Sequence, residues 1–199
     1  YVITHSILRN GWSDAVYMMG GKAIIAENLF VANGFDGAEA VNVKAGCQAD
    51  VAGNIMFSPN TNGLKLSSSG QSEERGQARV QAYNNTIINA GWRRDGEKGG
   101  CVYAEKNVLA NVFNNLMVNC KFRAQTPSYK NPNNPEEGYD NTSVIDYNYY
   151  ASGSQRSDIV FADASGVAYA WEGYNYAHKN YYEGVVDAHS VIATEQDGK

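Results

Sequence analysis

The chain has 199 residues, of which 43% are hydrophobic and only 19% charged, and its formal net charge is −5. This balance is typical of one domain that buries a core, and it excludes an intrinsically disordered chain. Because the net charge is negative and no run of basic residues is present, nucleic acid and anionic membranes are excluded as main partners. No stretch of 18 apolar residues occurs, so we expect no membrane-spanning helix in this segment.

The most regular feature along the chain is a repeat. A polar residue stands directly before a short apolar strand six times, at intervals of about 22 to 33 residues. A unit of that size cannot bury its own apolar side, so the pattern predicts a solenoid of stacked turns. The six positions are Ser6, Asn28, Asn54, Asn85, Asn115 and Asn148.

Each turn is predicted to contain three short strands and three bends. Most of these segments alternate apolar and polar residues, which is the period of a half-buried strand. No long segment has apolar residues at helical spacing, so we expect very little α-helix. The third strand set follows the six polar positions, the first set covers 15–18, 40–43, 63–66, 100–103 and 121–124, and the second covers 23–26, 49–52, 79–82, 109–112 and 144–147.

The recurring asparagines have a structural interpretation. Asparagine tolerates left-handed backbone in a tight bend, and its amide can bond to the same amide one turn above and below. We therefore expect Asn28, Asn54, Asn85 and Asn115 to form a single file through the molecule.

Three segments carry a family resemblance: Asn-Asn-Thr-Ile-Ile-Asn-Ala-Gly (84–91), Gly-Asn-Ile-Met-Phe (53–57) and Asn-Asn-Leu-Met-Val-Asn (114–119). In this pattern the chain resembles the pectate lyase superfamily. The resemblance implies an all-β, right-handed parallel β-helix of about six turns over residues 1–153. It also implies a carbohydrate-active protein located outside the cell or on the bacterial cell surface.

The ends of the chain are predicted to differ from the repeat. The sequence opens in the middle of a turn at Tyr1, which indicates a piece of a longer protein. Over residues 154–199 the repeat fades, and we expect an irregular segment that packs on the coil or caps its end.

The same resemblance indicates where chemistry would lie, because ligand and catalytic residues in that family project outward from the first strand set. The first outward column reads Tyr17, Asn42, Lys65, then Val102 or Tyr103 because two registers are open, then Arg123. A second outward column, two residues further along each strand, includes Lys44 and Glu105. Rows about 4.8 Å apart would place Lys44, Lys65 and Arg123 in an interrupted basic strip.

A basic strip suits an acidic polysaccharide. A lyase acting on uronic acids must neutralise the sugar carboxylate so that a base can remove the neighbouring proton. The resemblance implies Lys65 and Arg123 as that base or as the carboxylate clamp. The alternatives are lysines that only hydrate an outer strand face, and a non-catalytic glycan-binding or surface-interaction module. A hydrolase would need paired carboxylates, and the outward columns supply only Glu105.

The bends before the first strands each carry an aromatic residue and then an aspartate. Trp12 and Phe35 are expected to be neighbours, either as walls of a sugar groove or as a staple that sets the bend. Asp14, Asp36 and Glu39 are candidate calcium ligands, since hard cations take several carboxylate oxygens. The alternative is that these aspartates serve the turn alone.

The loop over residues 91–100 is a further candidate. Trp92 with Arg93 and Arg94 would offer a stacking ring beside fork-shaped donors, as carboxylated or sulfated sugars require. The charges nearly balance through Asp95, Glu97 and Lys98, so a solvated loop is the alternative.

The cysteines and histidines receive no functional role. Cys47, Cys101 and Cys120 fall at different points of their turns, so we expect no pair at bonding distance and predict free buried thiols. His5 and His178 have no acid or nucleophile partner visible in the sequence.

Overall fold

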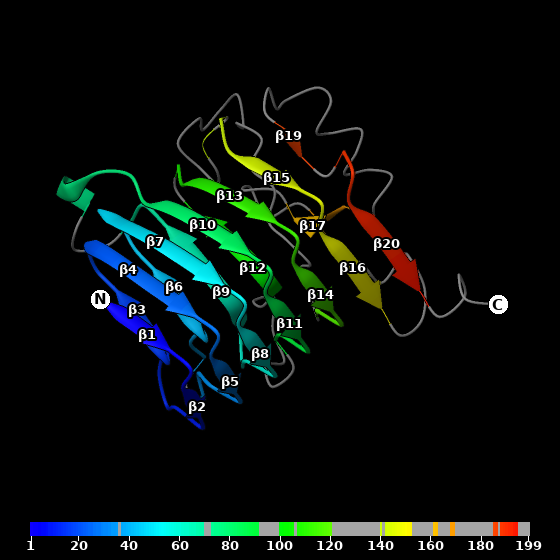
Figure 1. Cartoon of the computed structure of the whole chain (residues 1–199), viewed down its shortest axis with the longest axis horizontal. Coiled ribbons are helices and arrows are strands. Elements are labelled where there is room, and N and C mark those ends of the chain that lie inside the picture. Colours follow the sequence, from blue (N-terminus) through cyan, green and yellow to red (C-terminus); the bar gives the residue numbers. More distant parts are fainter. Residues whose placement is uncertain are drawn as a thin grey trace.

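The computed structural model describes residues 1–35, 37–69, 73–91, 100–105, 107–120, 140, 142–152, 161–162, 168–169, 185–186 and 188–194. Over these residues the chain forms a right-handed parallel β-helix (Figure 1). Its one helical element in the described part is the 3-10 turn η1 (Glu73–Arg75). The predicted all-β solenoid with very little helix is confirmed. No helix among the described residues is long and apolar enough to cross a membrane.

Parallel sheets run along the coil, and each successive strand of a sheet comes from the next turn of the chain (Figure 1). Sheet A contains, in spatial order, β1 (Val2–Thr4), β4 (Gly21–Ala26), β7 (Cys47–Ala52), β10 (Arg79–Tyr83), β13 (Leu109–Phe113), β15 (Val144–Asp146) and β19 (Val185–Val186). Sheet B contains β2 (Ile7–Arg9), β5 (Leu29–Val31), β8 (Ile55–Phe57), β11 (Thr86–Ile88), β14 (Leu116–Val118), β16 (Tyr149–Ser152) and β20 (Val191–Thr194).

Sheet C is shorter and carries the candidate site. Its described strands are β3 (Val16–Met18), β6 (Val41–Val43), β9 (Asn62–Ser67) and β12 (Gly100–Glu105). A small antiparallel pair joins β17 (Phe161–Ala162) to β18 (Ala168–Tyr169).

The core is the inside of the coil. Alternation along β7 buries Cys47, Ala49 and Val51 and exposes Gln48 and Asp50. Equivalent residues of neighbouring turns then stack on one another, so the apolar area of each turn is removed from water by the turns above and below it.

The predicted asparagine file is confirmed. The Nδ2 atoms of Asn28, Asn54, Asn85 and Asn115 each donate to Oδ1 of the next asparagine at 3.0 Å, ending on Asn148. All five side chains are buried. At the far end the backbone N–H of Asn148 donates to Ser190 Oγ at 2.9 Å, so a serine occupies the next rung.

The prediction that the ladder asparagines themselves adopt left-handed backbone is wrong. The left-handed residue is the one before each ladder asparagine, for example Glu27 (φ 57) and Asn84 (φ 56), and not the ladder residue itself. The chain changes direction at the residue before the asparagine, because the asparagine side chain has to point into the coil to reach its partners. The asparagines are therefore required for their amides rather than for their backbone freedom.

The last described turn comes from the segment expected to be irregular. β19 and β20 add a seventh strand to sheets A and B. Asp146, which is buried, accepts bonds from the backbone N–H of His189 and from its ring Nδ1, both at 2.7 Å, and so ties this turn to the coil. Most of residues 153–187 lie outside the described residues, so the boundary at 153 stays a prediction.

The cysteine prediction is wrong for one pair. Cys101 and Cys120 form a disulfide with their Cα atoms 5.5 Å apart. Cys101 lies in β12, whereas Cys120 follows β14 near the bend of the next turn, so a comparison of equivalent positions missed their proximity. Cys47 is the buried free thiol that was expected, and its Sγ accepts from Gly20 N–H at 2.9 Å.

The ladder generates the first prediction. Asn85→Ala removes the donor to Val51 O and the acceptor of the Asn54 N–H, both buried. Because buried unsatisfied groups cost about 1 to 3 kcal/mol each, we expect the free energy of unfolding to fall by about 2 to 4 kcal/mol in urea titrations. Asn111→Ala, whose bonds are exposed, is the matched control and should cost less than about 1 kcal/mol. Equal losses in both variants would contradict the role given to the ladder.

The contact of His189 with Asp146 generates a pH prediction. Burial would raise the pKa of Asp146, but hydrogen bonds from the His189 ring and from two backbone N–H groups outweigh it and hold this pKa below its ordinary 3.8. A depressed folded-state pKa adds stability above pH 4 that is lost as pH falls further. We expect Asp146→Asn to flatten the acid limb of a stability-versus-pH curve, and exposed Asp50→Asn to leave it steep.

Candidate functional site

The outward column predicted on the first strand set is formed on sheet C. Strand register pairs Tyr17 with Asn42, Asn42 with Lys65, and Lys65 with Tyr103. Of the two residues that the sequence left open for the fourth outward position, Tyr103 is the one that faces outward, because Val102 is buried in the core. Arg123, the fifth member, lies outside the described residues.

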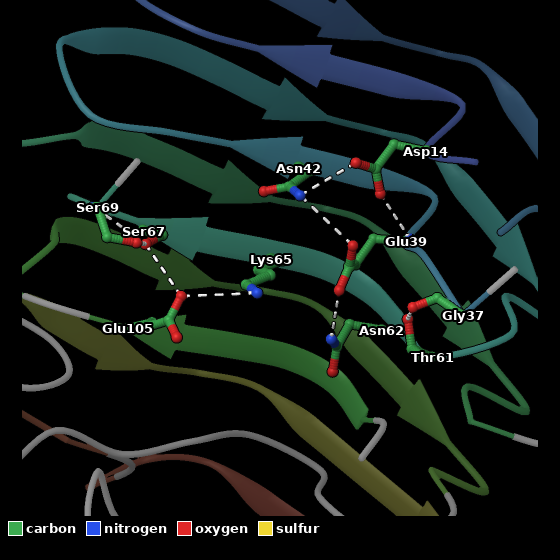
Figure 2. Close-up of polar contacts among 10 residues, drawn as sticks. All are labelled: Asp14, Gly37, Glu39, Asn42, Thr61, Asn62, Lys65, Ser67, Ser69 and Glu105. Carbon is green, nitrogen blue, oxygen red and sulfur yellow. Dashed lines mark hydrogen bonds and ion pairs between the residues drawn. The ribbon is translucent and has the colours of Figure 1, made fainter. Parts of the chain in front are cut away.

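Polar side chains gather on and beside this column (Figure 2). We call Asp14, Glu39, Asn42, Asn62, Lys65, Ser67 and Glu105 the outer polar cluster. It has an acidic end near the start of the strands and a basic centre formed by Lys65.

At the acidic end, amide groups hold two carboxyls together. Asn42 Nδ2 donates to Asp14 Oδ2 at 3.1 Å and to Glu39 Oε2 at 3.4 Å. Asn62 Nδ2 donates to Glu39 Oε1 at 3.0 Å, and the backbone N–H of Glu39 donates to Asp14 Oδ1 at 2.7 Å. Asn42 Oδ1 is buried and has no hydrogen-bond partner among the described residues, although burial of such an atom is costly.

This arrangement changes the acidity of Glu39. Burial first, and then the hydrogen bond and charge of Asp14, raise the pKa of Glu39 from 4.5 to about 7, although Lys65 and Asn62 partly oppose them. Glu39 therefore holds its proton below about pH 7 and can exchange it near neutrality, which is a property of proton-transfer groups.

The basic centre is built around Lys65. Its Nζ lies 3.5 Å from Glu105 Oε2 and 5.6 Å from the centroid of the Tyr103 ring, and its side chain is only 21% exposed. Ser67 Oγ donates to Glu105 Oε2 at 3.1 Å and so positions that carboxylate. Lys65 is thus a positioned, partly shielded cation rather than a freely moving surface lysine.

Lys44 lies in the next outward column, directly after β6. Burial lowers the pKa of Lys44, the charge of Lys65 lowers it further, and the carboxylates of Glu105, Glu39 and Asp14 only partly oppose this. Lys44 and Lys65, two members of the predicted basic strip, therefore repel each other electrostatically. The third member, Arg123, lies outside the described residues.

Sequence reasoning grouped Asp14 and Glu39 as candidate calcium ligands or turn residues, but it missed the side-chain amides that hold their two carboxyls together. It counted only Glu105 as an outward acid. The signal was present in the spacing, since Asp14, Glu39 and Asn62 each stand three residues before Tyr17, Asn42 and Lys65 respectively. That common offset places them in one column of the stack.

The described residues on their own do not form a calcium site. Calcium takes six to eight oxygens, whereas only two carboxyls meet here, and their oxygens already accept amide and backbone hydrogen bonds. No group of three or more potential metal ligands occurs within the described part of the chain. Asp36, on which the calcium prediction also depends, lies outside it, so that prediction stays untested.

The predicted aromatic neighbours are confirmed. The ring centroids of Trp12 and Phe35 lie 5.0 Å apart at an interplanar angle of 35°. Both side chains remain more than half exposed, so the pair forms an outer apolar surface at the bend and not a buried staple. Trp92, Arg93 and Arg94 lie outside the described residues.

Comparison with family models, with curated proteins and with solved structures finds no match to this chain. The class of protein is therefore defined by the coordinates alone, as a right-handed parallel β-helix with a polar cluster on the outer face of one sheet.

The raised pKa of Glu39 predicts a pH-dependent stability. Between pH 4.5 and about 7 the folded state binds a proton that the unfolded state has lost, so the free energy of unfolding falls as pH rises through this range. Glu39→Gln, which mimics the protonated form, should remove that fall in urea titrations at pH 5, 6, 7 and 8. Glu105→Gln is the control, and a Glu39→Gln curve parallel to wild type would contradict the assignment.

Proposed function

We propose that the outer polar cluster binds an acidic, uronic-acid polysaccharide and cleaves it by β-elimination. The observation that supports this most directly is the placement of a shielded cation, Lys65, in the turn next to that of Glu39, a carboxyl with a pKa of about 7. Eliminative cleavage needs both a charge that neutralises the sugar carboxylate and a group that exchanges a proton near neutral pH.

The reaction divides into roles that these side chains suit. The Lys65 ammonium pairs with the sugar carboxylate, which acidifies the proton on the adjacent ring carbon. Glu39, in its ionised form, accepts that proton. The glycosidic oxygen at the neighbouring carbon leaves with the electron pair of its bond and is reprotonated from water, so a carbon–carbon double bond forms in the sugar.

The remaining residues serve binding in this proposal. Asn42 positions the Asp14 and Glu39 carboxyls at the centre of the column through its side-chain amide. Tyr17 and Tyr103 offer ring faces to the sugar on either side of it. The exposed Trp12–Phe35 pair extends the apolar surface at the bend. Arg123, Trp92, Arg93 and Arg94 are proposed as further sugar contacts. A substrate of this kind places the protein outside the cell or on the bacterial cell surface.

A second function is favoured by one observation. Lys65 is already paired with Glu105, so its charge is partly satisfied without any ligand. A glycan-binding module without catalysis would need no more than this cluster and the exposed rings.

An assay for unsaturated products separates the two. We expect absorbance near 235 nm to rise when the chain is incubated with at least one of polygalacturonate, alginate or a glycosaminoglycan, and Lys65→Met to lower the rate at least about 100-fold through loss of the clamp. Lys22→Met, on the exposed face of sheet A, is the matched control and should retain the rate.

Binding measurements on the same polymers complete the test. Saturable binding without any absorbance change assigns the chain to the non-catalytic module. Neither binding nor absorbance change with any acidic polymer contradicts both proposals.

A further inference from the structure

Lys65 already faces a carboxylate, and that carboxylate belongs to the protein itself. Lys65 Nζ lies 3.5 Å from Glu105 Oε2 (Figure 2). A charge-assisted hydrogen bond between such groups is shorter, at about 2.7 to 2.9 Å. The contact is therefore an electrostatic pairing, and it does not use up the three N–H donors of the ammonium group.

Glu105 is held in place by bonds that do not involve Lys65. Strand register places Glu105 opposite Ser67, which is two residues along β9 from Lys65. The buried Ser67 hydroxyl donates to Glu105 Oε2 at 3.1 Å. The backbone N–H of Ser69 in turn donates to Ser67 Oγ at 3.1 Å and so fixes that hydroxyl. The carboxylate therefore keeps its position when the ammonium group turns towards a ligand.

The same carboxylate acts on a second cation. Lys44 lies in the outward column that also contains Glu105, directly after β6. Burial and then the charge of Lys65 lower the pKa of Lys44, and Glu105 is the carboxylate that opposes them most. Glu105 thus compensates two lysines that repel each other.

An acidic sugar bound to Lys65 would bring a second carboxylate close to Glu105. The two like charges repel each other, and the repulsion grows with the number of negative groups that the polymer carries near the site. A polymer with sulfate groups as well as carboxylates is therefore penalised more than one with a single carboxylate per sugar. Repulsion of this kind is a common means of discriminating between ligands.

We propose that Glu105 is a specificity-determining residue, which serves as the counter-ion of Lys65 and Lys44 in the empty site and biases that site towards carboxylated polymers over sulfated ones. This inference rests on the function proposed above, in which Lys65 pairs with the sugar carboxylate. Glu105 has no part in the proton transfer. Its charge stabilises the empty site and weakens binding.

Glu105→Gln tests the proposal, because it keeps the length of the side chain and an acceptor for Ser67 while removing the charge. The probes are polygalacturonate and heparin, a sulfated glycosaminoglycan, titrated in a calorimeter at low ionic strength, where screening is weak. The dissociation constant should fall at least about fivefold for polygalacturonate and at least about twentyfold for heparin. The free energy of unfolding should fall as well, since the two lysines then repel each other without compensation.

Two further variants serve as controls. Glu27→Gln makes the same change in net charge at an exposed side chain on another bend, where the partner is His5. It should leave both dissociation constants unchanged. Lys65→Met in the Glu105→Gln background should reverse the gain in affinity, because the gain depends on the freed ammonium group. Circular dichroism checks that every variant folds.

Several results would overturn the proposal. A purely structural role for Glu105 would lower stability without tightening binding. A role as an acceptor for sugar hydroxyl groups would weaken the binding of Glu105→Gln. Equal gains for the two polymers would contradict the bias against sulfated ligands, and so would a Glu105→Gln variant that binds neither polymer.

The outcome can be separated from that of the elimination reaction, because binding is measured without reference to cleavage. Tighter binding by Glu105→Gln without any unsaturated product supports this inference and contradicts the elimination. Unsaturated products together with an unchanged affinity of Glu105→Gln support the elimination and contradict this inference.

Discussion

The structure depends on the in-register stacking of successive turns, and the buried asparagine ladder is what makes that register specific. An apolar interior alone would tolerate sliding of one turn over another, because burial is non-directional. Each ladder amide instead bonds to the next amide and to a backbone carbonyl of the preceding turn, as Asn54 does with Asn85 and Ile25. A shift by one residue would leave buried polar groups unsatisfied, which is costly in a low-dielectric interior.

Fixed register has a direct chemical consequence. Residues about 25 positions apart, such as Asp14 and Glu39, become neighbours on an outer face, and the amides of the same stack hold their carboxyls together. The stack thereby creates a desolvated carboxyl at Glu39 and a shielded cation at Lys65 in adjacent turns. The fold is a rigid support on which chemistry is set by the outward residues, so its function has to be argued from them.

The three sheets share the same alternation of inward and outward residues but differ in the chemistry of their outer faces. Inward strand residues are mostly apolar. Outward residues mix charged and apolar side chains on sheet A, carry the paired charges on sheet C, and are mostly apolar on sheet B. Since core and outer face occupy alternate positions of each strand, the outer faces can vary without disturbing the interior. This independence allows a candidate catalytic face on sheet C without any change to the interior.

The sequence was enough to predict the solenoid, the ladder file and the outward column through Tyr17, Asn42 and Lys65, because the repeat interval and the strand periodicity can be read directly along the chain. It did not determine which of Val102 and Tyr103 faces outward, the Cys101–Cys120 disulfide, the left-handed residue ahead of each ladder asparagine, or the shared proton-binding environment of Asp14 and Glu39. Those depend on how far each bend carries the chain before the next strand begins. Only the tertiary structure fixes that distance, because bends of different length are closed by contacts with neighbouring turns.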